Sequence, residues 1–293
     1  MLGELTDKNS EILGAWLLLV SSLFFGLPHG AYDFWILFDS THRTPKPFRS
    51  LLIRLLIYLS PALLVIGIWW FLPSVILVAF LGLTVWHFGS GDAIWANDNR
   101  YQWILESIGR GLIIISAPLA FHPIESGSVL GKLDAYSSEK LILLAPYGLI
   151  IGIILFLIRY FNGFRKTQNI LSLVEIVFLL VFFRLTTPLL AVTIYLIGVH
   201  SWRHLLRLDL YEKDHQVPTK SILKIIRHFH QRALPITIIS LAGLGLIYWM
   251  WAFNLSDLAN YTSAYLVLLS ALTLPHAILI TQNELNRQIS SSA

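Results

Sequence analysis

Long apolar stretches constrain the fold of this chain more than any other feature of its sequence. A helix that crosses a bilayer needs about 20 mostly apolar residues, because each residue adds about 1.5 Å and the hydrocarbon core is about 30 Å thick. Charged residues make up only 13% of the 293 residues, about half the share of a soluble chain. The polar surface that so few charged residues provide is too small to cover a folded protein in water. The sequence therefore predicts an all-α, polytopic transmembrane bundle, with one integral-membrane domain over residues 1–293.

The apolar runs divide into about nine predicted spans. The first is interrupted at Leu27-Pro28-His29-Gly30, the sixth is short, and the break before the seventh depends on Thr186-Thr187-Pro188. Eight spans are therefore the alternative. The nine predicted spans cover residues 12–38, 51–71, 74–91, 103–121, 141–161, 169–184, 187–208, 233–253 and 261–281.

Basic residues predict how the bundle is oriented. With nine spans and the N-terminus outside, the outer side carries only Lys8, Lys132, Lys140 and Arg184 of the 21 Lys and Arg residues. Cytoplasmic loops of membrane proteins are enriched in these residues. We therefore expect a protein of the cell membrane with an outside N-terminus and a cytoplasmic C-terminus. The net charge of +4 has the same explanation, and no motif indicates nucleic-acid binding.

Apolar and basic residues alternate at helical spacing over residues 220–232, before the eighth predicted span. Such a pattern is typical of an amphipathic helix that lies in the membrane interface. We therefore expect an interfacial amphipathic helix on the inner leaflet, just before the eighth predicted span.

Histidines are the candidate functional residues. The chain has no cysteine, so a metal ion would be held by His, Asp, Glu or backbone oxygen. Ionisable residues within spans are costly and are functional candidates by default. Five of the ten histidines fall inside predicted spans: His29, His87, His200, His204 and His276. The remainder fall in loops or at the interface: His42, His122, His215, His228 and His230.

The five intramembrane histidines share one predicted depth. Their spans all run from outside to inside, and each histidine lies 13 to 17 residues from the start of its span. At about 1.5 Å per residue, all five lie roughly 20–25 Å below the outer boundary. That layer is the inner third of a hydrocarbon core about 30 Å thick. We therefore expect the five side chains to meet in a metal site.

Spacing adds detail to this site. His200 and His204 are four residues apart, so both side chains project from one helical face. Asp33 is four residues after His29 and could accept the second ring N–H of a metal ligand, or pair with Arg203 or Arg207.

Small residues after His87 permit close helix approach. Each Pro-His pair, at Pro28 and Pro275, is expected to kink its helix. Imidazole ligands suit iron, copper, zinc or nickel.

Other residues and other functions fit this pattern less well. Glu106 and Arg110 are spaced as a structural ion pair on the fourth span, and Asp92 is weaker evidence for a site because it is nearer the interface.

A membrane di-iron desaturase or hydroxylase would carry more His boxes, and the chain has one HxxxH pair. A b-type haem carrier would place histidines at two depths. A transporter with a His-lined midmembrane site is the remaining alternative.

Four motifs in order resemble one enzyme family. They are Gly26-Leu27-Pro28-His29-Gly30-Ala31-Tyr32-Asp33, Trp86-His87-Phe88-Gly89, His200-Ser201-Trp202-Arg203-His204 and Leu274-Pro275-His276. Together they resemble the Brp/Blh family of bacterial and archaeal β-carotene 15,15′-dioxygenases, from about residue 20 to residue 280.

The resemblance implies a membrane-embedded enzyme that uses Fe(2+). It implies that the enzyme cleaves the central 15,15′ double bond of β-carotene with O2 to give two molecules of all-trans-retinal, which microbial rhodopsins can receive as chromophore. The family's iron ligands match His29, His87, His200 and His204. His276 and Asp33 are left as candidates for a supporting or pocket role, with a fifth ligand the further option for His276.

Overall fold

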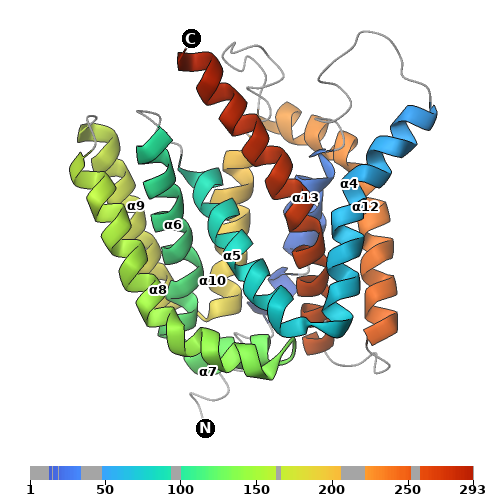
Figure 1. Cartoon of the computed structure of the whole chain (residues 1–293), viewed down its shortest axis with the longest axis horizontal. Coiled ribbons are helices and arrows are strands. Elements are labelled where there is room, and N and C mark those ends of the chain that lie inside the picture. The colour runs from blue at the N-terminus through green and yellow to red at the C-terminus, as the bar shows by residue number, and fades with distance from the viewer. Residues whose placement is uncertain are drawn as a thin grey trace.

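The computed structural model describes residues 13–14, 16–18, 20–33, 48–93, 100–162, 166–205, 222–251 and 258–292. Within these ranges all regular secondary structure is helical, which confirms the all-α prediction. Figure 1 shows the long helices side by side, running up and down as an antiparallel bundle.

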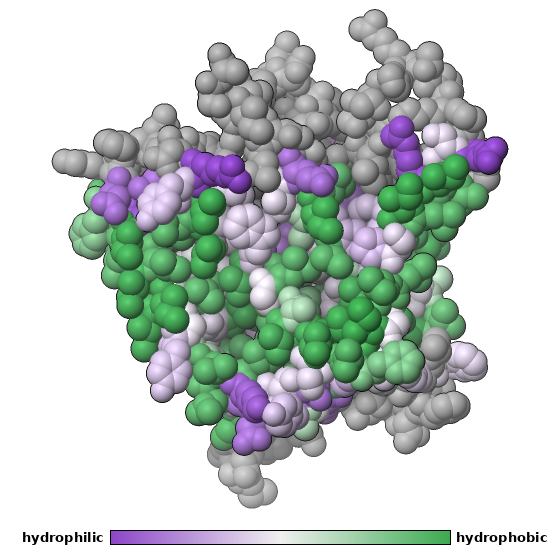
Figure 2. Space-filling model, in the orientation of Figure 1, coloured by the Kyte–Doolittle hydropathy of each residue, from purple (hydrophilic) through white to green (hydrophobic). Residues whose placement is uncertain are grey.

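Six helices of the described chain are long and apolar enough to cross a membrane. On the face that Figure 2 shows, a band of apolar side chains crosses the middle of the bundle, with polar side chains toward both ends. This distribution fits a body surrounded by lipid. The six helices are α4 (Phe48–Phe71), α5 (Pro73–Asp92), α6 (Arg100–Phe121), α8 (Ala135–Asn162), α12 (Ile222–Trp251) and α13 (Leu258–Ser292).

The predicted count of nine spans is not confirmed. The sixth predicted span forms α9 (Lys166–Leu185), which is not among the six. The seventh divides into α10 (Pro188–Tyr195) and the π-helix η2 (Leu196–His200), and its end lies outside the described residues. The described part of the first contains the π-helix η1 (Ser22–Gly26) and the short α2 (Leu27–Ala31).

Two segments outside the predicted spans are also helical. Residues 122–140, expected as an outer connection, contain α7 (Pro123–Gly131), which lies across the lower end of the bundle in Figure 1. The predicted interfacial helix is not separate, because α12 runs without interruption from Ile222 to Trp251. Its basic part is the first section of a long helix.

Proline and aspartate mark where several helices begin. Pro73, Pro123 and Pro188 stand in the first turns of α5, α7 and α10, where the missing N–H costs nothing. Asp134 precedes α8 and accepts hydrogen bonds from Ser74 Oγ at 2.7 Å and from the Ser137 amide at 2.8 Å. Burial alone would raise the pKa of Asp134, but these hydrogen bonds outweigh it and hold that pKa below its ordinary value.

Glycines allow α5 and α6 to pack with their backbones in contact. A Cβ atom on Gly89 would lie 1.7 Å from the carbonyl oxygen of Ser107, and one on Gly111 would lie 1.8 Å from the carbonyl oxygen of Val85. Side chains on both sides of this contact would force the helices apart. The expected close approach after His87 is therefore confirmed, and it fixes the height of His87 against α6.

Candidate metal centre

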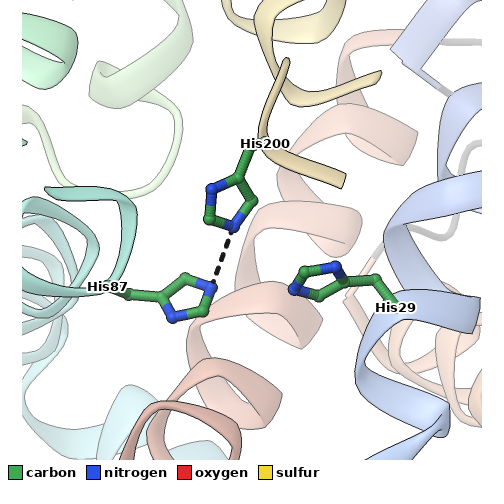
Figure 3. A group of neighbouring side chains, drawn as sticks. All are labelled: His29, His87 and His200. Atoms are coloured by element: carbon green, nitrogen blue, oxygen red, sulfur yellow. Dashed lines mark hydrogen bonds between the residues drawn. The ribbon is translucent and has the colours of Figure 1, made fainter. Parts of the chain in front are cut away.

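Five buried histidines converge from segments far apart in the sequence. His29 comes from α2, His87 from α5, His200 from the end of η2, His204 from the helical residues after it, and His276 from α13. The ring centroid of His29 lies 6.0 Å from that of His87, 5.2 Å from His200, 3.8 Å from His204 and 4.7 Å from His276. The predicted clustering of the five side chains is therefore confirmed. Figure 3 shows the rings of His29, His87 and His200 turned toward a common centre.

His29 is the residue that joins this cluster together. Ligand atoms of His29, His87 and His200 lie within 4.8 Å of one another, and so do those of His29, His204 and His276. His200 and His204 thus fall in different groups, although their spacing placed them on one helical face. Both groups contain His29, which therefore lies close to His200 and to His204.

Asp33 orients His276 rather than His29. The Nδ1 atom of His276 lies 2.7 Å from Asp33 Oδ2, and the Tyr58 hydroxyl donates to the same oxygen at 2.6 Å. The expected contact between a carboxylate and a cluster histidine is present, but its partner differs. Spacing along one helix identifies only partners on that helix, whereas His276 reaches Asp33 from α13.

Asp92 has a similar position beside His200. Its Oδ1 atom lies 3.4 Å from His200 Nδ1, and its Oδ2 atom accepts a hydrogen bond from the hydroxyl of Tyr195. All three residues are buried. In the sequence Asp92 was the weaker candidate because of its height in α5. Neither Tyr195 nor Tyr58 carried a signal in the sequence that would separate it from the other tyrosines.

Two π-helical turns adjoin the cluster. η2 ends at His200, and η1 ends three residues before His29. A π turn adds a residue to the turn and is frequent at functional sites. The carbonyl of Phe24 in η1 contacts His230 Nε2 at 2.7 Å, so this irregular turn is tied to α12. η2 thus carries His200 as its last residue, and η1 directly precedes α2, which carries His29.

Gly91 provides space for the ring of His200. A Cβ atom there would lie 3.0 Å from Cε1 of the imidazole, which is closer than ordinary van der Waals contact. The small residues after His87 therefore serve two purposes. Gly89 admits α6, and Gly91 admits the ring of His200.

A network of buried and partly buried ion pairs continues outward from Asp92. Arg203 lies 3.8 Å from Asp92 and 2.7 Å from Glu175. Arg110 contacts Glu175 at 3.2 Å and Glu106 at 2.8 Å, which confirms the predicted pairing of Glu106 with Arg110. Glu106 also pairs with a second guanidinium, that of Arg159, at 3.2 Å. Arg203, which was a possible partner of Asp33, therefore pairs elsewhere, and Arg207 lies outside the described residues.

An apolar cavity of about 270 Å³ opens beside the histidines. His29, His87, His200 and His276 line it together with leucine, isoleucine and valine side chains from most of the surrounding helices. None of the lining residues, within the described part of the chain, is Asp, Glu, Lys or Arg. The cluster is thus reached through an apolar space.

Two of the other histidines contact backbone carbonyls away from the cluster, and two lie outside the described residues. His122 contacts the Phe183 carbonyl at 2.8 Å, and His230 contacts the carbonyls of Ile226 and Phe24. His42 and His215 lie outside the described residues. The predicted separation into cluster and peripheral histidines therefore holds for His122 and His230.

The donor set of the cluster fits a transition metal. Imidazole nitrogens suit iron, copper, zinc and nickel. His276 Nδ1 faces a carboxylate, so its Nε2 is the atom that a neutral ring leaves with a lone pair. The Nε2 atom of His29 lies 3.0 Å from that of His276, and the Nε2 atoms of His200 and His87 lie 3.2 Å apart. These nitrogens face one another inside a buried cluster, as the ligands of one bound cation would.

Comparisons with known proteins identify the family of the chain. A family model described as beta-carotene 15,15′-dioxygenase matches residues 20–282. A probable beta-carotene 15,15′-dioxygenase Blh of Halobacterium salinarum is 27% identical over 90% of this chain and 82% of its own length. The beta-carotene 15,15′-dioxygenase of uncultured marine bacterium 66A03 is 28% identical over 90% of this chain and 92% of its own length. No solved structure matches the chain. The chain belongs to the β-carotene 15,15′-dioxygenase family.

Proposed function

We propose that this protein cleaves the central 15,15′ double bond of β-carotene with O2 and releases two molecules of all-trans-retinal. The observation that carries the proposal is the convergence of five buried histidines beside an apolar cavity. A metal site alone would suit many reactions, and an apolar cavity alone would suit many lipids. Their combination suits an oxygenase whose substrate is a hydrocarbon. The names of the two relatives supply the particular bond.

The proposed cofactor is one Fe(2+) ion per chain, held by His29, His87, His200 and His204. Iron(II), when bound, supplies the redox chemistry that lets O2 react with the polyene. Four neutral imidazoles would leave the charge of the ion unchanged and would leave positions around it open. The buried surroundings of the histidines keep bulk water away from the reacting bond.

The cavity is the proposed binding site for the polyene. A β-carotene molecule has no polar group, so a lining without charged residues lets it enter without desolvation cost. Aliphatic side chains on α4, α10, α12 and α13 would hold the chain extended beside the histidines. Binding in this cavity would hold one particular double bond of the polyene beside the histidines. This positioning is the main contribution that the cavity makes to the reaction.

The surface of the bundle offers a route from the lipid. Ile239 on α12 lines the cavity and is also 58% exposed on the outside of the bundle. A substrate dissolved in the bilayer could therefore reach the cavity laterally, without crossing water. We propose the cell membrane as the location, with the N-terminus outside, the C-terminus cytoplasmic, and a microbial rhodopsin as one acceptor of the product.

The function is tested by expressing the chain in a bacterium that produces β-carotene. The expected result is loss of orange colour together with accumulation of all-trans-retinal, measured by chromatography. Purified protein in detergent should consume about one O2 per β-carotene and release two retinal molecules. Products longer or shorter than retinal would contradict central cleavage, and an unchanged β-carotene pool with inserted protein would contradict the activity itself.

Filling the cavity should slow cleavage without removing the metal. Ser240 lines the cavity from α12, a helix that carries none of the five histidines. Ser240→Trp should therefore reduce the rate of β-carotene cleavage by about tenfold or more, because the indole occupies space that the polyene needs. Retinal yield and iron content are measured on the same purified sample.

Ile238→Trp is the matched control, because Ile238 is a neighbour on the same helix, is 56% exposed and is not among the lining residues. Its activity should remain near that of the wild type. Equal activity of the two variants would show that the cavity is not the substrate site.

A further inference from the structure

The environments of His276 and His200 have the same components. Each Nδ1 atom faces an aspartate, at 2.7 Å for His276 and Asp33 and at 3.4 Å for His200 and Asp92. Each aspartate also accepts a hydrogen bond from a buried or partly buried tyrosine hydroxyl, Tyr58 in one case and Tyr195 in the other. The aspartates are fully buried. Such carboxylate partners are typical of metal-bound histidines, because they fix the tautomer and the direction of the ring.

We propose that His276 is a fifth histidine ligand of the same metal ion, and that Asp33 and Tyr58 are its positioning residues. The proposal rests on the proposed function only for the presence of a metal site. Asp33 and Tyr58 would then orient His276 in the same way as Asp92 and Tyr195 orient His200.

The spacing of the Nε2 atoms supports this assignment. His276 Nε2 lies 3.0 Å from His29 Nε2, and His200 Nε2 lies 3.2 Å from His87 Nε2. With metal–nitrogen bonds of about 2.1 Å, two ligand nitrogens at right angles on one ion lie about 3.0 Å apart. The pair that contains His276 therefore has the same spacing as the pair that contains two expected ligands. In each pair, one ring (His276 or His200) faces an aspartate with its Nδ1 atom. The Nε2 atom of that ring is therefore left unprotonated, and it faces the other histidine of the pair.

A packing role would make the 3.0 Å contact a hydrogen bond between the rings of His276 and His29. A neutral imidazole has one donor and one acceptor nitrogen, and the Nδ1 atom of His276 donates to Asp33. The side chain is 4% exposed, and its Nε2 atom can either accept that hydrogen bond or bind a metal ion. A measurement of metal binding separates the two roles. His276 also lines the cavity, whereas His204 does not. It is therefore placed on the side of the cluster that a small molecule entering the cavity would meet.

Cobalt(II) is the probe that tests the proposal, since its visible absorption weakens as the coordination number rises. His276→Ala should lower the affinity of the purified protein for Co²⁺ by more than about 100-fold and should intensify and shift the absorption bands. Asp33→Asn should lower the affinity by about 10–100-fold, as losses of such partners do in other metal sites. Asp92→Asn should have an effect of the same size.

Exogenous imidazole separates a lost ligand from a lost packing group. The cavity reaches His276, so imidazole added to His276→Ala should restore the wild-type spectrum and much of the affinity. His122→Ala is the control, because His122 contacts Phe183 away from the cluster, and its spectrum should be that of the wild type. If His276→Ala does not insert into membranes, His276→Gln, which keeps polarity and much of the volume, takes its place.

An unchanged Co²⁺ spectrum in the His276 variant would overturn the proposal, and so would a changed spectrum that imidazole fails to restore. These outcomes are independent of the reaction. Wild-type protein that binds Co²⁺ as described but yields no retinal would reject the proposed function alone. Protein that yields retinal while His276→Ala keeps the wild-type spectrum would reject the fifth ligand alone.

Discussion

His29→Ala is expected to abolish retinal production and Fe²⁺ binding together. His29 belongs to both groups of histidines, so its loss breaks each of them. Losing a residue that only supports a ligand typically costs about 10–100-fold in affinity or activity, and losing a shared ligand should cost more. Retinal is measured by chromatography and normalised to membrane-inserted protein, and iron is measured by elemental analysis of the same preparation.

The other proposed ligands should behave in the same way. His87→Ala, His200→Ala and His204→Ala should each remove retinal production while α5 and α10 remain folded. His215→Ala is the control, because His215 belongs to a predicted cytoplasmic connection outside the described residues. Retention of activity by all four ligand variants would remove the metal proposal. Two iron ions per wild-type chain would favour the di-iron alternative.

Glu106→Gln should destabilise the bundle by about 3–5 kcal/mol, the usual cost of breaking a buried ion pair by removing one partner. Glu106 is 1% exposed and contacts Arg110 at 2.8 Å and Arg159 at 3.2 Å. With glutamine at this position, the buried guanidinium groups of Arg110 and Arg159 would lose the negative charge that Glu106 provides. Thermal unfolding in detergent, monitored by circular dichroism, measures the effect as a lower Tm.

Glu139→Gln is the matched control, because Glu139 is exposed on α8. Its Tm should remain within the error of the wild type. Equal Tm values for the two variants would show that the network of Glu106, Arg110 and Arg159 contributes nothing to the stability of the bundle.

The sequence predicted the clustering because depth in a membrane can be counted along the chain. A helix rises by a fixed distance per residue, so similar offsets from the span starts place His87, His200 and His276 at nearly one height. Composition alone predicted the fold class, since an apolar chain in lipid has few ways to satisfy its backbone. Neither inference depends on how the helices pack.

The partners of the histidines could not be predicted in this way. Asp33 is on the same short segment as His29, but its contact with His276 depends on how α13 packs against α2. Spacing along one helix carries no such information. The same limit applies to Tyr58 and Tyr195, which reach the aspartates from other helices.

The π turns could not be predicted from the sequence. An inserted residue in η2 rotates the helix before it by about 100° relative to the helix that continues after His200. No residue in Leu196–His200 is a proline, and nothing in its composition marks a π turn. The interruption of the first predicted span was visible at Pro28, whereas the turn η1 before it was not.

The scattered origin of the five histidines would also make binding of the proposed metal ion part of the stability of the protein. An ion held by residues 29, 87, 200, 204 and 276 is a cross-link that ties together the beginning, middle and end of the chain. Because such an ion binds the folded state and finds no preformed site in the unfolded one, thermodynamic linkage converts its concentration into folding free energy. A free concentration one hundred times the Kd adds about 2.7 kcal/mol. Iron supply would therefore govern how much of this protein persists in the membrane, as well as how fast each molecule turns over.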